Sequence, residues 1–208
     1  MAERNWYERR VLPLLTDIAC GMPPIRRQRE RIVPLARGRV LEVGIGTGRN
    51  LAHYVREKID ALVGLDPAPE MLSRARRRAR RAGIEAHVVV QSAERIPCAD
   101  ASFDTVLVTY ALCSIADPLA ALAEMRRVLK PDGRLLFLEH GLAPDPAVRR
   151  WQSKLSPFWS RIAGGCRLDR DVPALLRSAG FRCEDLQAAY LPGPRVLAYN
   201  YWGAATAG

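Results

Sequence analysis

The sequence predicts an α/β fold whose mostly parallel sheet is covered by helices on both faces. Three observations lead to this prediction. Short apolar strands alternate with helices between residues 39 and 138, and continuously apolar strands are typical of a parallel sheet buried on both sides. A glycine-rich turn, Gly44–Gly48, directly follows the first strand. Further on, Leu191–Pro194 is so short a connection that the two strands it joins have to run antiparallel.

Residues 3–37 are expected to form two helices that are divided at Cys20–Pro24. The first carries an apolar stripe at helical spacing, made of Trp6, Val11, Leu14, Leu15 and Ile18. The paired prolines can open the second helix, and Gly38 ends it. This segment is interpreted either as a lid over a ligand, with its hinge at Gly21 and Met22, or as a structural cap on the sheet.

The next elements follow in strict alternation. Strands are predicted at Arg39–Val43, Ala61–Leu65, Ala86–Val90, Phe103–Thr109 and Arg134–Leu138. Helices are predicted at Asn50–Lys58, Pro69–Ala82 and Pro118–Leu129, and a turn at Lys130–Gly133. Helices then follow at Pro144–Ala163 and Val172–Ala179, and an antiparallel pair of strands at Phe181–Ala189 and Arg195–Tyr201. The result is a seven-stranded sheet whose last strand runs against the others.

Composition limits the possible functions. With 208 residues, 49% of them apolar, the chain can bury the core of one domain. The five cysteines include no C-x-x-C pair and the three histidines are scattered, so neither a disulfide scaffold nor a metal site is expected. No signal peptide and no run of about 20 apolar residues is evident, which predicts a cytoplasmic protein with at most peripheral membrane contact. The net charge of +10 fits generic solubility, or attraction to a membrane, a nucleic acid or an acidic substrate.

The strongest local signal is the segment Leu41–Asn50, L-E-V-G-I-G-T-G-R-N. Glycines after a buried strand let the backbone turn sharply and let a ligand approach closely. The next strand ends at Asp66, whose carboxylate is placed to accept hydrogen bonds from ribose hydroxyls; the alternative for Asp66 is a helix cap. Glu42 adds negative charge inside the strand, which favours a cationic amino acid–nucleoside over a dinucleotide.

These residues resemble the class I S-adenosylmethionine (SAM)-dependent methyltransferases of the methyltransferase type 11 group. The resemblance covers about residues 38–140 and includes G-L-D-P-A-P-E-M-L, Q-S-A-E-R-I-P and V-L-K-P-D-G-R-L-L-F-L-E-H. It implies SAM as cofactor, the strand order 3-2-1-4-5-7-6, and three segments: a helical lid (1–37), a SAM-binding core (38–140) and acceptor-side helices with a final β-hairpin (141–208). The implied cofactor-binding residues are Gly44, Gly46, Gly48, Asp66, Pro67, Met71, Ser92, Ala93, Glu94 and Tyr110, to which the charge argument adds Glu42.

A narrower resemblance concerns the acceptor. The segments T-Y-A-L-C-S-I, E-H, W-Q-x-x-L-x-P-x-W and G-G-C-R-L-D-R are similar to the methyltransferase-like thiol S-methyltransferases and their small bacterial relatives. This implies a small-molecule or lipid-like acceptor, with S-methylation of a thiol as the leading expectation. Phospholipid N-methylation and quinone C-methylation are alternatives, because those families share the SAM motifs.

His140 and Tyr110 are the candidate catalytic residues. His140 ends the fifth strand, at the edge where open α/β sheets bind ligands, and could act as a base; the alternative is a histidine that bonds local backbone. Tyr110 could contact the acceptor or cover the cofactor. Cys113 is expected to be a small buried apolar residue, and Cys166 either a contact in the acceptor pocket or part of a tight turn.

Two functions of other classes remain to be weighed. A nucleic-acid methyltransferase would use the arginine-rich helix Pro69–Ala82, but its arginines do not form one stripe and no target-base motif follows the fourth strand. A binding module that holds SAM without catalysis is the other. No nucleic-acid partner is expected.

Overall fold

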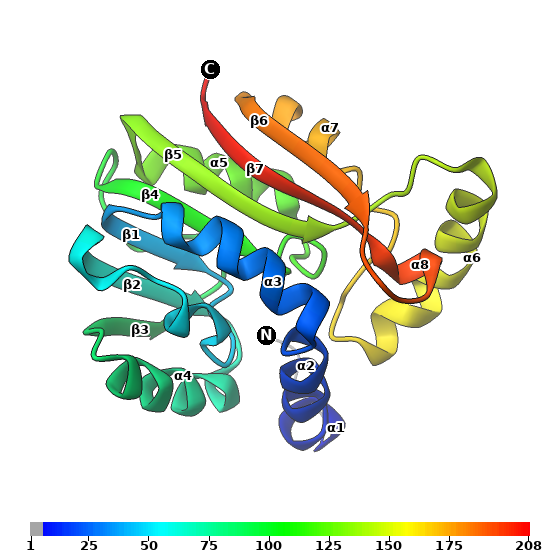
Figure 1. The fold of residues 1–208 in the computed structure, drawn as a ribbon, viewed down its shortest axis with the longest axis horizontal. Coiled ribbons are helices and arrows are strands. Elements are labelled where there is room, and N and C mark those ends of the chain that lie inside the picture. The colour runs from blue at the N-terminus through cyan, green and yellow to red at the C-terminus, as the bar shows by residue number, and fades with distance from the viewer. Residues whose placement is uncertain (1–5) are drawn as a thin grey trace.

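The computed structural model describes residues 6–208 and shows one seven-stranded sheet in the order β3-β2-β1-β4-β5-β7-β6 (Figure 1). Its strands are β1 (Gly38–Val43), β2 (Ile59–Asp66), β3 (Ala86–Val90), β4 (Phe103–Thr109), β5 (Leu129–His140), β6 (Phe181–Tyr190) and β7 (Tyr199–Ala207). β7 runs antiparallel to both of its neighbours, β5 and β6, and the other pairs are parallel. The predicted fold and strand order are confirmed.

Helices flank the sheet and extend past the carboxyl ends of its strands (Figure 1). They are α1 (Trp6–Arg10), α2 (Leu12–Cys20), α3 (Pro23–Ile32), α4 (Pro69–Ala82), α5 (Pro118–Val128), α6 (Pro146–Ile162), α7 (Val172–Ser178) and α8 (Arg195–Ala198). α3 lies across one face of the sheet, and α5 and α7 lie on the other. No helix within residues 6–208 combines the length and the apolarity needed to cross a bilayer.

The alternation of side chains along β1 shows why both faces of the sheet need cover. Leu41 and Val43 pack with residues of α5 and α7, whereas Val40 packs with residues of α3. Glu42 shares the α3 face, so a carboxylate lies inside an otherwise apolar layer. This placement brings a charged group directly beneath the turn that follows β1.

The first predicted N-terminal helix is divided at Val11 into α1 and α2. Three further local predictions are wrong. Residues 50–58 form two 3₁₀ turns, Arg49–Ala52 and Arg56–Lys58, because Val55 between them is extended (φ −85°, ψ 102°). The predicted turn at Lys130–Gly133 is an irregular part of β5, which already pairs with β4 at Leu129.

The third difference concerns the predicted strand Arg195–Tyr201. Its first half is the short helix α8, which begins after Pro194, and the strand β7 begins only at Tyr199. The side chain of Gln152 in α6 donates a hydrogen bond to the carbonyl oxygen of Val196 (3.2 Å). This contact between α6 and α8 is tertiary, so the apolar pattern alone predicted a strand there.

Candidate functional site

The turn after β1 carries three glycines with positive φ: Gly44 (71°), Gly46 (52°) and Gly48 (81°). A Cβ on Gly44 would lie 2.4 Å from the Cβ of Ala111 in the loop after β4. A Cβ on Gly48 would lie 2.9 Å from the Cα of Ala75 in α4. Two of the glycines therefore allow close packing of neighbouring segments, whereas Gly46 faces more open space.

Asp66, at the end of β2, holds this turn in place. One carboxylate oxygen accepts a hydrogen bond from the backbone N–H of Gly46 (2.9 Å), and the other accepts one from Ala68, just before α4 (2.8 Å). Asp66 thus links the glycine turn to the start of α4. It also lines the large cavity at this edge of the sheet, so the structural and the binding interpretations are compatible.

A cavity of about 670 Å³ opens at the carboxyl ends of β1, β2 and β4. Cavities of this size are typical of proteins that bind small molecules. Predicted residues on its wall are Glu42, Gly44, Gly46, Asp66, Pro67, Met71, Ser92, Ala93, Glu94 and Tyr110. Gly48 is not among the lining residues; it lies behind the turn, against α4. Leu12, Thr16 and Cys20 of α2 complete the wall, so the N-terminal helices border the cavity.

Glu42 lies at the base of this cavity within a buried polar network. Its carboxylate accepts hydrogen bonds from the Asn50 amide (2.9 Å) and the Tyr54 hydroxyl (2.7 Å). The guanidinium of Arg29, from α3, donates to Asn50 and to Thr109. Burial raises the pKa of the Glu42 carboxyl to about 7, even though Tyr54, Arg29 and Asn50 favour its ionised form. A positively charged ligand would therefore find a carboxyl that titrates near neutrality.

Asp17 of α2 ties the N-terminal helices to the glycine turn, a feature that the sequence analysis missed. It accepts hydrogen bonds from the Thr47 hydroxyl (2.5 Å), from Arg49 Nε (2.8 Å) and from Arg78 of α4 (2.8 Å). Partial burial alone would raise the pKa of the Asp17 carboxyl, but these hydrogen bonds hold it well below its ordinary range. We call this group of four residues the Asp17 clamp.

Tyr110 follows β4 with a φ of 53°, which is strained for a bulky side chain. Its hydroxyl donates a hydrogen bond to Asn200 Oδ1 (2.8 Å) on β7, and the Arg29 guanidinium lies 5.3 Å from its ring centre. These contacts hold the ring as part of the cavity wall. Burial, the largest cause, raises the pKa of the Tyr110 hydroxyl above its ordinary value.

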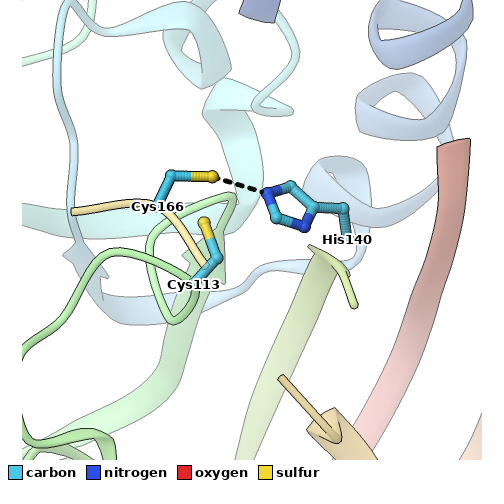
Figure 2. Close-up of side chains that lie close together, drawn as sticks. All are labelled: Cys113, His140 and Cys166. Carbon is cyan, nitrogen blue, oxygen red and sulfur yellow. Dashed lines mark hydrogen bonds between the residues drawn. The ribbon is translucent and has the colours of Figure 1, made fainter. Parts of the chain in front are cut away.

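His140 lies at the end of β5 and meets two cysteines. Figure 2 shows its ring pointing toward Cys113, from the loop after β4, and Cys166, from the loop after α6. His140 Nε2 is 3.0 Å from Cys166 Sγ, and the three candidate ligand atoms all lie within 4.8 Å of one another. We call these three residues the Cys–His cluster. Sequence spacing could not reveal it, because three separate segments contribute one residue each.

The Cys–His cluster has unusual electrostatics. A hydrogen bond from the Cys166 thiol, together with the positive charge of His140, lowers the pKa of the Cys113 thiol well below its usual range. Burial alone would lower the pKa of His140, but the negative charge of Cys113 raises it. The expectation that Cys113 is a small buried residue describes its burial but not these contacts.

Glu139 fixes the loop that carries Cys113. One of its carboxylate oxygens accepts hydrogen bonds from the backbone N–H groups of Ala111 (2.7 Å) and Leu112 (3.0 Å). Burial and the nearby Cys113 thiolate raise the pKa of the Glu139 carboxyl to about 8. Its other oxygen, Oε2, is buried without a hydrogen-bond partner.

Comparison with known proteins agrees with this geometry. A family model described as "Methyltransferase domain" matches residues 41–137. A thiol S-methyltransferase, TMT1B, from Rattus norvegicus is 34% identical over 160 residues, which cover 74% of this chain and 64% of the relative. The chain thus spans less than two thirds of that relative's length.

Two further comparisons extend the likeness. A demethylmenaquinone methyltransferase from Thermus thermophilus is 36% identical over 149 residues, and the match covers 67% of each protein. The solved structure of protein PH0226 from Pyrococcus horikoshii shares the fold, with a TM-score of 0.66 at 20% identity and full coverage of both chains. The chain therefore belongs to the methyltransferase-domain family, whose cofactor is S-adenosylmethionine.

Proposed function

We propose that this protein transfers the methyl group of SAM to a small thiol. The residues that line the cavity support the cofactor part of this proposal. Gly44 and Gly46 leave room for the methionine portion and the sugar, and the Asp66 carboxylate lines the same cavity at the end of β2, where it can accept hydrogen bonds from ribose hydroxyls. Glu42 offers a carboxylate to the cationic part of the cofactor.

The thiol part of the proposal rests on His140, which does not itself line the cavity but lies close to Tyr110, which does. Among residues 6–208, His140 is the histidine next to this cavity: its ring centre is 6.5 Å from that of Tyr110, which lines the cavity. A thiol is partly ionised near neutral pH, so its methylation needs alignment with the sulfonium and only modest help in losing a proton. His140 Nε2 contacts Cys166, so the predicted role of His140 as a base requires that contact to open.

The reaction is a simple displacement. The sulfur of the acceptor attacks the methyl carbon, the bond from that carbon to the sulfonium sulfur breaks, and S-adenosylhomocysteine and a methyl thioether are formed. The thiol proton leaves to solvent or to a base. The protein contributes a fixed approach for the acceptor and a wall that excludes water, with Tyr110 as the proposed contact on the acceptor side.

A lipid-like acceptor is the second candidate, and exposed apolar side chains favour it. Trp6 on α1 and Ile18 on α2 are 72% and 67% exposed, and Phe158 on α6 is 62% exposed. The hydroxyl of Tyr7 donates to the carbonyl oxygen of Ile162 (2.7 Å), so the N-terminal helices and α6 are neighbours. Such a surface would suit contact with a membrane and methylation of a phospholipid amine or a quinone carbon.

A nucleic-acid acceptor has less support. Two of the arginines on α4, Arg74 and Arg78, already pair with Asp17, at 3.8 and 2.8 Å. They are therefore committed within the protein and do not form part of a free phosphate-binding stripe.

The three classes of acceptor are tested by measuring the S-adenosylhomocysteine that the purified protein forms. The protein is incubated with SAM and, separately, with small alkyl and aryl thiols, phosphatidylethanolamine vesicles and a demethylquinone. Turnover with thiols that is lost in His140→Ala, while SAM affinity is retained, is the expected result. His87→Ala is the matched control, because His87 lies in β3, away from the cavity. Turnover with the lipid or the quinone alone would overturn the thiol assignment, and SAM binding without turnover on any acceptor would leave a SAM-binding module.

A further inference from the structure

We propose that the Cys–His cluster binds one zinc ion. Two sulfurs and one imidazole nitrogen are ligands that zinc prefers, at about 2.3 Å for sulfur and about 2.0–2.1 Å for nitrogen. A tetrahedral site with these bond lengths places its ligand atoms about 3.5–3.8 Å apart. In the structure these atoms all lie within 4.8 Å of one another, and His140 Nε2 points to the sulfurs (Figure 2). Small side-chain shifts therefore suffice to close a site.

The backbone around the cluster already holds its three members together. The N–H of Arg167 donates a hydrogen bond to the carbonyl oxygen of Cys113 (2.9 Å), which joins the loop after α6 to the loop after β4. The N–H of Tyr110 donates to the carbonyl oxygen of Leu138 (2.8 Å), which joins the latter loop to the end of β5. Ligands on rigid, connected segments lose little freedom when a metal binds.

Charge gives a second argument for a metal. Cys113 is buried, and His140 and Cys166 are only partly accessible. Buried charges in proteins are paired with opposite charges or coordinate metals. Two thiolates neutralise a divalent cation, and the imidazole binds it in its neutral form, so the occupied site carries no net charge. Zinc is also a thiophilic ion without redox chemistry of its own, so it binds thiolates without oxidising them.

Three protein ligands leave the fourth tetrahedral position open, as in catalytic zinc sites. The Cys–His cluster lies beside the cavity at the carboxyl ends of β1, β2 and β4. Ala111 and Ser114, close to Cys113 in the chain, line this cavity, and so does Gly164, close to Cys166. An acceptor thiol could take the open position; on coordination it would lose its proton to solvent and remain bound as the thiolate. The methyl group would then pass to that sulfur from the sulfonium. This last step rests on the proposed thiol S-methylation, whereas zinc binding itself does not.

Metal binding is tested on the full chain, purified under reducing conditions. Elemental analysis after dialysis against Zn²⁺ should give about one zinc per chain, and replacement by Co²⁺ should give thiolate-to-cobalt charge-transfer absorption. Cys113→Ser and Cys166→Ser should each lose the bound metal and this absorption. Cys183→Ser is the matched control, since Cys183 in β6 is a free cysteine outside the cluster and should leave both unchanged. SAM affinity is measured for all three variants, and an affinity equal to that of the wild type shows that a variant is folded.

The outcomes separate the metal site from the reaction. Zinc retained by both cluster variants, or no cobalt–thiolate absorption in the wild-type protein, would overturn the proposed site. Thiol turnover that continues at full rate after the zinc has been removed by a chelator would overturn the role of zinc while leaving S-methylation standing. Stoichiometric zinc bound through the cluster without turnover on any thiol would support the site and overturn the thiol-acceptor step.

Discussion

Glu42 is a buried residue whose ionisation affects the stability of the fold and, in our proposal, the binding of SAM. It is 2% exposed, lies under the glycine turn, and receives hydrogen bonds from Asn50 and Tyr54. Because burial favours its neutral form, its carboxyl binds a proton more readily in the folded protein than in the unfolded chain. This group therefore stabilises the fold most at low pH, and that contribution is lost as the pH rises from the unfolded value of 4.5 to about 7.

The affinity for SAM, in contrast, should increase with pH. A cationic ligand prefers the ionised Glu42 carboxylate, so binding should tighten as the pH rises through about 7. Glu42→Gln should weaken SAM binding about tenfold at pH 8 and flatten the pH dependence, since a hydrogen bond to a charged group contributes ~1.5–3 kcal/mol. Calorimetric titration at pH 6 and pH 8 measures both effects. Glu85→Gln, at an exposed position before β3, is the control; equal affinities for Glu42→Gln and wild type at pH 8 would contradict this role.

At the scale of elements, close packing of the glycine turn against α4 requires a glycine at position 48. Gly48→Ala combines strain at φ 81° with a Cβ that lies 2.9 Å from the Cα of Ala75 and 2.5 Å from Leu51 Cδ1. Overpacking of this kind costs ~1–3 kcal/mol, and the positive φ adds ~1–2 kcal/mol. We expect a loss of unfolding free energy of about 2–4 kcal/mol, measured by urea denaturation.

Gly83, the residue that follows α4, provides the matched control. Gly83→Ala has a similar φ of 64°, but its Cβ would meet only the end of the flexible Arg56 side chain, at 3.5 Å. Gly83→Ala should therefore lower the unfolding free energy only by the cost of the positive φ, ~1–2 kcal/mol. Equal losses in the two variants would show that contact between the turn and α4 is not what requires Gly48.

The elements that sequence patterns placed correctly are those with clear local signals at their ends. α4 begins at Pro69 and ends before Gly83, as predicted, because proline suits a first helical turn and glycine suits the left-handed residue after it. Residues 195–201 lacked such signals, and contact with α6 decided their structure. The segment 50–58 was misjudged because its Asn50 and Tyr54 side chains serve the Glu42 network rather than a regular helix.

At the scale of the whole molecule, the Asp17 clamp joins the N-terminal helices to the glycine turn and to α4. The interactions that form it connect residues 30, 32 and 61 positions apart. No local pattern reveals partners at such separations, and the same holds for the Cys–His cluster. The glycine turn and Asp66 could be predicted because their residues are close in sequence and form a recognisable motif.

Loss of the clamp should loosen the N-terminal helices while leaving the sheet intact. Asp17→Asn leaves Arg49 and Arg78 without a carboxylate partner, so SAM should dissociate about tenfold faster, with little change in the unfolding of the sheet. Stopped-flow displacement of SAM measures the dissociation rate. Glu30→Gln removes an exposed ion pair with Arg26 on α3 and serves as control. Unchanged dissociation in Asp17→Asn would show that these helices are a static cap.

The position of β7 affects how the protein is made. β7 follows β6 in the chain but lies between β5 and β6 in the sheet, and among the described strands β6 pairs with β7 alone. As the polypeptide leaves the ribosome, β6 emerges before the strand that will pair with it. Its backbone must therefore stay unpaired, or be shielded by chaperones, until β7 has been synthesised and inserts between the two edges. Interruption of translation just before β7 should thus yield nascent chains prone to aggregation, even though β1 to β5 are already present.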